Sequence, residues 1–159
     1  MKLLRASPDQ FVFHLGQRER QLLLDTLQLY PLVPPAHHRV AAAGQRADAE
    51  AQRLLDEALA EQRRELRQQL LAILKHPARL RETSRGFELT LTPPEMEWLL
   101  QVLNDVRVGS WLALGEPAEN EVPQLSQPNA SYLVAMEICG AYQSVLLAAL
   151  GTEQSPGWH

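Results

Sequence analysis

An internal match of the sequence to itself is the feature that most constrains the fold of this chain. Residues 4–75 align without gaps onto residues 80–151 at an offset of 76, and 14 of the 72 paired positions are identical. The identities recur at positions that a shared fold would need: Leu4, Arg5, Phe11, Leu15, Glu19, Leu23, Leu24, Leu27, Leu70, Leu71 and Ala72. Solenoid repeats have shorter periods, of roughly 20 to 50 residues. We therefore predict two copies of one unit, related by a pseudo-twofold axis.

Each copy is expected to form a strand, a helix, a proline-interrupted connection and a second helix. Residues 11–15 are short and β-prone, and residues 87–91 alternate apolar with polar side chains as a half-buried strand does. Two such strands can pair with each other. The sequence thus predicts a mainly α, α+β fold, with four principal helices and a small antiparallel strand pair. Residues 1–151 would form one duplicated domain of two β-α-α copies, followed by a flexible tail at 152–159.

The expected helices have clear start and stop signals. Thr92-Pro93-Pro94-Glu95 provides a hydroxyl N-cap, prolines in the first turn and a carboxylate at N3, so a helix should run from 93 to about 115. Its counterpart at 17–30 is shorter because Pro31 stops it. The second helices are expected at about 47–76 and 129–150, and Glu137 is the only charge in the latter. A helix so apolar lies at the centre of a bundle or under another subunit, which leaves a homodimer open.

The composition of the chain limits the cellular compartment and the kinds of partner that we expect. A chain of 159 residues with 45% hydrophobic content can bury one core without a metal or a disulfide. Cys139 is the only cysteine and has apolar neighbours, which indicates a packed thiol and a reducing compartment. No signal peptide or membrane span is evident, so a cytoplasmic protein without a membrane partner is expected. A formal net charge of -4 argues against general nucleic-acid binding.

One segment resembles a known family. Residues 98–107 read Trp-Leu-Leu-Gln-Val-Leu-Asn-Asp-Val-Arg and are followed by Leu-Ala-Leu-Gly at 112–115. This resembles the Leu-Asn-Asp-Xaa-Arg and Leu-Gly signature of a bacterial family known as domain of unknown function number two thousand and seventeen. Glu19-Arg20 and Tyr132 precede leucine-rich stretches that resemble its first and last helices. The resemblance implies a bacterial cytosolic protein without assigned chemistry, and in actinobacteria such genes often neighbour that of a Clp protease adaptor, which points to protein quality control.

The same segment provides the candidate contact surface. Gln101, Asn104 and Asp105 share one helical face, opposite the apolar stripe, and Arg107 lies further round. They form either a polar surface able to hold a carboxylate or a peptide backbone, or a solvated face whose charged residues cap neighbouring loops. Trp111 is the preferred exposed contact, because large aromatic side chains often anchor interfaces.

Nothing in the sequence identifies a catalytic residue, a metal ligand set or a cofactor site. The motifs HExxH, CxxC and GxSxG and a glycine-rich phosphate loop do not occur. The adjacent His37 and His38 could bind a metal only if other ligands converged on them. Glu19 and Glu95 occupy equivalent places in the two copies, but a capping box explains Glu95, and the duplication most simply explains Glu19. The sequence therefore favours a protein that is not an enzyme.

Three classes of function stay open at this point. The preferred one is a non-catalytic interaction or regulatory module that binds a partner protein or a second copy of itself. The alternative is an enzyme or small-ligand-binding protein with a pocket between the two copies, lined by Asn104, Asp105, Arg107 and Tyr132. Nucleic-acid binding would require six arginines to converge, and neighbouring glutamates argue against it; these arginines are Arg63, Arg64, Arg67, Arg79, Arg81 and Arg85.

Overall fold

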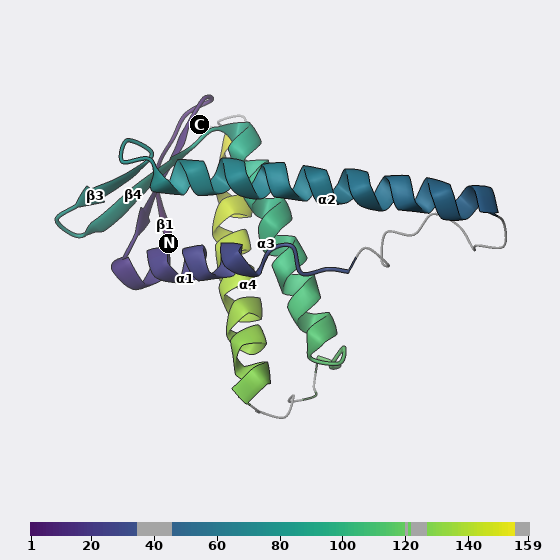
Figure 1. The fold of residues 1–159 in the computed structure, drawn as a ribbon. Coiled ribbons are helices and arrows are strands. Elements are labelled where there is room, and N and C mark those ends of the chain that lie inside the picture. Colours follow the sequence, from purple (N-terminus) through teal and green to yellow (C-terminus); the bar gives the residue numbers. More distant parts are fainter. Residues whose placement is uncertain (35–45, 120, 122–126, 155–159) are drawn as a thin grey trace.

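The computed structural model describes residues 1–34, 46–119, 121 and 127–154 of the chain (Figure 1). It is an α+β structure with four helices and a four-stranded antiparallel sheet in the described residues. In chain order the elements are β1 (Lys2–Ala6), β2 (Phe11–Leu15), α1 (Gln17–Leu29), α2 (Arg46–Lys75), β3 (Leu80–Thr83), β4 (Gly86–Leu91), α3 (Pro93–Ala113) and α4 (Gln127–Gln154).

The two predicted strands pair at the centre of the sheet. The strand order is β1-β2-β4-β3, and β2 runs antiparallel to β4 with Phe11 opposite Leu91 and Leu15 opposite Phe87. The prediction of a single strand pair is corrected, because β1 and β3 extend the sheet on each side. Both outer strands are short and mostly exposed, so their sequences lack the alternation of a half-buried strand.

The core lies between one face of the sheet and the helices. Phe11, Phe13 and Leu15 of β2 are fully buried, as is Leu89 of β4. Since side chains alternate across a strand, these residues share one face, and it packs against apolar residues of the helices. In Figure 1, α3 and α4 run side by side to the right of the sheet, and they form the most extensive helix pair of the described residues.

The predicted starts of α1 and α3 are confirmed. At the start of α3, the Thr92 amide donates to Glu95 Oε1 at 3.0 Å, and the Glu95 amide donates to Thr92 Oγ1 at 3.5 Å. At the start of α1, the Gly16 amide donates to Glu19 Oε1 at 2.9 Å. Each N3 carboxylate thus satisfies a backbone N–H that the helix leaves without a partner.

The end of α4 differs from the prediction. The helix continues to Gln154, so residues 152–154 belong to it and not to a tail. Residues 155–159, including Trp158, lie outside the described residues, as do His37 and His38. The chain is apolar through Leu150. A single glycine, Gly151, follows, and the next proline is Pro156, so the sequence allows the helix to continue to Gln154.

Two helices have large surfaces that no other described element covers. In Figure 1, the N-terminal part of α2 projects beyond α3 and α4. α4 buries Ala135, Cys139, Tyr142 and Leu146, but Val134 and Leu147 are exposed. Between Asn129 and Gly151, this helix has a mean hydropathy of 1.7 and could cross a membrane by length and composition, a property that core helices of soluble proteins share.

Candidate binding site between α2 and α3

A hollow of about 510 Å³ lies between α2 and α3, beside the segment that follows α1. Its apolar lining comes from Val33, Leu59, Leu66, Val108 and Leu112. Three neutral amide side chains, those of Gln62, Gln101 and Asn104, also line it. The other lining residues are Tyr30, Arg63, Asp105, Trp111 and Glu116. The hollow is therefore mainly apolar, with amides able to donate and accept hydrogen bonds.

The structure brings four of the five predicted contact residues to this hollow. Gln101, Asn104, Asp105 and Trp111 all line it. Arg107 lies elsewhere, in a second hollow of about 440 Å³ against α4, which Trp111 also lines. Trp111 therefore stands between the two hollows. Tyr132, the other expected member of a pocket between the copies, lines neither of them.

Asp105 holds the chain segment that follows α1. Its Oδ1 accepts from the amides of Leu32 at 2.7 Å and Val33 at 3.2 Å. Its Oδ2 lies 3.6 Å from Arg63 Nη2, and both side chains are only 12% exposed. Arg63 Nη1 also donates to the Val33 carbonyl at 2.9 Å. Of the two interpretations given for this residue, the structural one fits Asp105, because both oxygens are already engaged.

The remaining candidate side chains are more open to a partner. Gln101 and Asn104 are exposed, and Arg107 Nη2 donates to Asn104 Oδ1 at 3.3 Å. Trp111 is 37% exposed, and its Nε1 donates to the Pro117 carbonyl at 3.0 Å. Because the indole N–H is engaged, a partner would contact Trp111 through its ring.

A phenol and three charged side chains also line the hollow. Burial, assisted by the charge of Asp105, raises the pKa of Tyr30. The Asp105 and Arg63 charges offset each other across their ion pair. Among the described residues, no group of three or more His, Cys, Asp or Glu side chains could hold a metal ion. The hollow is thus suited to binding by shape, apolar contact and neutral hydrogen bonds.

Cys139 lies away from this hollow and is fully buried in α4. Burial raises the pKa of its thiol to about 12. Since only the thiolate is nucleophilic, the cysteine stays unreactive near neutral pH. This agrees with the packed thiol that its apolar neighbours predict.

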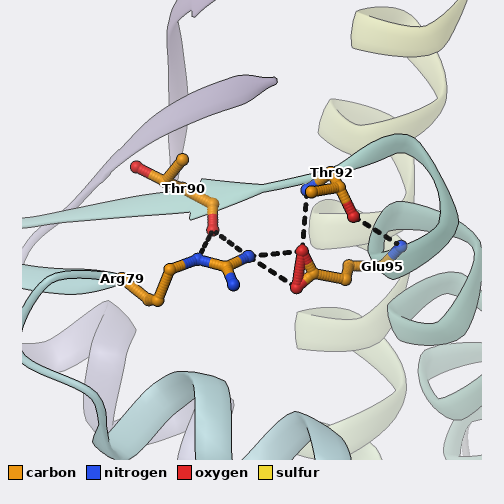
Figure 2. Close-up of polar contacts among 4 residues, drawn as sticks. All are labelled: Arg79, Thr90, Thr92 and Glu95. Atoms are coloured by element: carbon orange, nitrogen blue, oxygen red, sulfur yellow. Dashed lines mark hydrogen bonds and ion pairs between the residues drawn. The ribbon is translucent and has the colours of Figure 1, made fainter. Parts of the chain in front are cut away.

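A second polar cluster joins the sheet to the start of α3, as Figure 2 shows. Arg79 donates to the Thr90 carbonyl from Nε at 3.2 Å and from Nη2 at 3.0 Å, and it forms an ion pair with both oxygens of Glu95. Burial alone would raise the pKa of Glu95, but hydrogen bonds from Arg79 and Thr92 hold it below its usual value. The role of this cluster is structural, because the polar groups of Arg79 and Glu95 that form these contacts bind one another or the backbone at Thr90 and Thr92.

Ion pairs also engage most of the six arginines that nucleic-acid binding would require. Four of the six each pair with a carboxylate: Arg63 with Asp105, Arg64 with Glu61, Arg79 with Glu95, and Arg81 with Glu88. These four cannot neutralise phosphates without giving up an ion pair.

No local pattern in the sequence predicts the contacts that build the hollow. Arg63 and Asp105 are far apart in the chain, and neither belongs to a local motif that links them. The segment that follows α1 was expected only as a connection. Helical periodicity could place Gln101 and Asn104 together, because that relationship is local.

Comparison with known proteins adds no assignment. No family model matches the chain, and comparisons with curated proteins and with solved structures likewise found no match. The resemblance of residues 98–115 to the bacterial family therefore stays a prediction.

Proposed function

We propose that this protein is a non-catalytic interaction module that binds a segment of a partner protein in the hollow between α2 and α3. The observation that carries the proposal is the combination of apolar walls with the neutral amides of Gln62, Gln101 and Asn104. An amide side chain both donates and accepts, so it can pair with peptide N–H and C=O groups. An apolar side chain of the partner would fill the hollow as an anchor, against the ring of Trp111.

The family resemblance supports a class of partner for this module. A bacterial cytoplasmic protein linked to protein quality control meets exposed chain segments, and a mainly apolar hollow suits such segments. The exposed side of α4 supports a further mode, in which the module also binds a second copy of itself. Val134 and Leu147 are exposed in one chain, on opposite flanks of the stripe that α4 buries.

A small-ligand-binding protein is the second candidate. The hollow volume of about 510 Å³ lies within the range of small-molecule sites, roughly 300 to 1,000 Å³. It also lies between an element of the first half of the chain, α2, and one of the second half, α3. The ligand would be partly apolar and would carry no negative charge, because the charges of Arg63 and Asp105 cancel in their ion pair and Glu116 leaves one negative charge on the lining.

We also propose that the two halves arose by duplication. The order strand, strand, helix, helix occurs twice along the chain, which supports the internal sequence match. Phe13 pairs with Leu89 at the centre of the β2–β4 register, and these two residues are 76 apart, the offset of the match. A twofold axis through that pair would exchange the halves. The N3 carboxylates Glu19 and Glu95 have the same separation and the same role.

The test is a pull-down from native cell lysate with wild type and a Gln101→Ala/Asn104→Ala variant. Asp105 is left intact, because its loss would release the segment at Leu32 and Val33 and confuse unfolding with lost recognition. A Gln68→Ala/Gln69→Ala variant is the matched control, since it removes two exposed amides from α2 outside the hollow. Light scattering and circular dichroism confirm equal folding and assembly.

We expect a protein captured by wild type and by the control, and at least about tenfold less of it with the hollow variant, which corresponds to about 1.4 kcal/mol. Equal recovery by all three proteins would exclude the hollow as the contact surface. Native mass spectrometry of the purified protein separates the second candidate, because a small ligand would add a constant mass to wild type and not to the variant.

A further inference from the structure

A third hollow, of about 710 Å³, lies where α1, the C-terminal part of α2 and the β3–β4 hairpin meet. Its charged lining consists of Arg20, Arg67 and Lys75, with Glu82 as the one carboxylate. Three cations and one carboxylate leave two excess positive charges on this lining. The whole chain has a formal net charge of -4, so this hollow is cationic within an acidic protein.

Two of these cations have buried groups without partners. Only three buried side-chain nitrogen or oxygen atoms of the described residues lack a hydrogen-bond partner, and two of them are Nε of Arg20 and Nε of Arg67. The Arg20 guanidinium lies over the Phe87 ring, 4.8 Å from its centre. Neither guanidinium has an ion pair among the described residues. Buried donors are normally satisfied, and an exception in a folded protein calls for an explanation.

Under the proposed duplication, the corresponding positions of the second half carry no charge. The positions 76 residues further along the chain from Arg20, Arg67 and Lys75 hold Met96, Gln143 and Gly151, none of which is charged. Met96 is fully buried in the corresponding helix of the second half. An apolar or neutral side chain therefore serves the same helical positions there, and the cations of the first half need another reason.

We propose that this cationic hollow binds a small organic anion through a phosphate or carboxylate group held by Arg20 and Arg67. A guanidinium is planar and presents paired donors that match the oxygens of an oxyanion. Lys75 adds a third positive charge at the rim, and the Phe87 ring with the leucines of the lining contacts the apolar part of the ligand. A bound anion would offset the positive charge that Arg20 and Arg67 place on the lining of the hollow.

Isothermal titration calorimetry on the full chain with three matched probes tests this site. Phenyl phosphate and benzoate carry the two oxyanions on the same ring, and benzyl alcohol is the neutral control, all at constant ionic strength. We expect saturable one-to-one binding of at least one anion, at least about tenfold tighter than that of benzyl alcohol. The preferred probe identifies the oxyanion as phosphate or carboxylate. Equal binding of all three probes, or no saturable binding of either anion, would overturn the proposal.

The residues are tested with Arg20→Met/Arg67→Gln, which copies the side chains of the second half. We expect at least about a tenfold loss of anion affinity, because hydrogen bonds to charged groups are lost from both helices. Arg18→Met/Arg53→Gln is the control: it makes the same changes on α1 and α2 at exposed positions outside the hollow. Unchanged affinity in the first variant, or an equal loss in the control, would contradict the assignment.

Folding of the variants is followed by thermal denaturation. A second variant, Arg20→Lys/Arg67→Lys, keeps both charges and removes the paired donors, so its affinity should fall between those of wild type and the neutral variant. The Gln101→Ala/Asn104→Ala variant should keep full anion affinity, because those residues line the other hollow. The experiments therefore test the proposed anion site and the proposed partner surface independently of each other.

Discussion

Gly109 is the residue at which α3 comes closest to the segment that follows α1. A Cβ atom at this position would lie 2.7 Å from both Cβ and Cγ of Leu32 and 2.9 Å from its backbone carbonyl carbon. Gly109→Ala should therefore lower the free energy of unfolding by about 1 to 3 kcal/mol, because the helix must move away from a segment fixed by Asp105. Urea denaturation measures the difference.

Gly140 is the matched control for that substitution. It also lies inside a helix, but a Cβ atom there would have no neighbour within 4 Å. Gly140→Ala should raise the free energy of unfolding by up to about 1 kcal/mol through helix propensity alone. A similar gain for Gly109→Ala would show that the close approach to Leu32 does not constrain the fold.

Glu95 makes stability depend on pH. Its pKa in the folded chain lies below the usual glutamate value, which is about 4.3. The ionised carboxylate thus stabilises the fold above that usual value, and this contribution is lost as the pH falls through the folded pKa. Glu95→Gln should lower the free energy of unfolding by about 2 kcal/mol at pH 7, because charged hydrogen bonds to Arg79 are lost. At pH 3 the difference from wild type should be smaller.

Chemical denaturation at both pH values measures this difference. Glu97→Gln is the control: this exposed residue of α3 lies two positions further on, and its substitution should change the free energy of unfolding by less than about 0.5 kcal/mol. An equal effect of Glu95→Gln at pH 7 and pH 3 would show that the ionised carboxylate contributes nothing.

At the scale of secondary structure, the elements that the sequence predicted are those with local signals. The α3 start combines a hydroxyl, prolines and a carboxylate within four residues, Thr92 to Glu95, and it forms as predicted. The β2 and β4 strands have apolar residues on one face, so their register follows from burial. The α+β class and the helix count follow from these signals alone.

The elements that the sequence did not predict depend on distant partners. β1 and β3 form because the central strands offer free backbone groups at each edge, and not through any pattern of their own. Likewise the sequence predicted Asp105 as a contact residue for a partner. In the structure its oxygens bind the amides of Leu32 and Val33 and the guanidinium of Arg63, which are distant in the sequence. The cationic hollow also escaped prediction, because Arg20 and Arg67 meet only in the folded chain.

At the scale of the whole molecule, the outer side of α4 is the surface that most needs a partner. A helix this apolar lies either at the centre of a bundle or in a subunit interface. The structure places α4 against α3 on one side and leaves Leu147 58% exposed on the other. A twofold dimer would bury that side of both copies at once, so one substitution acts twice in the interface.

We therefore expect wild type to have the mass of a dimer in light scattering and Leu147→Glu to have that of a single chain. A buried carboxylate without a partner is strongly unfavourable, and the twofold symmetry would bury one from each copy. Leu54→Glu is the matched control, because Leu54 is 56% exposed and belongs to another helix, α2. A wild-type monomer, or a dimer that both substitutions leave intact, would contradict the prediction. A wild-type chain that floats with lipid vesicles, and loses this property in Leu147→Glu, would show that α4 contacts a membrane instead.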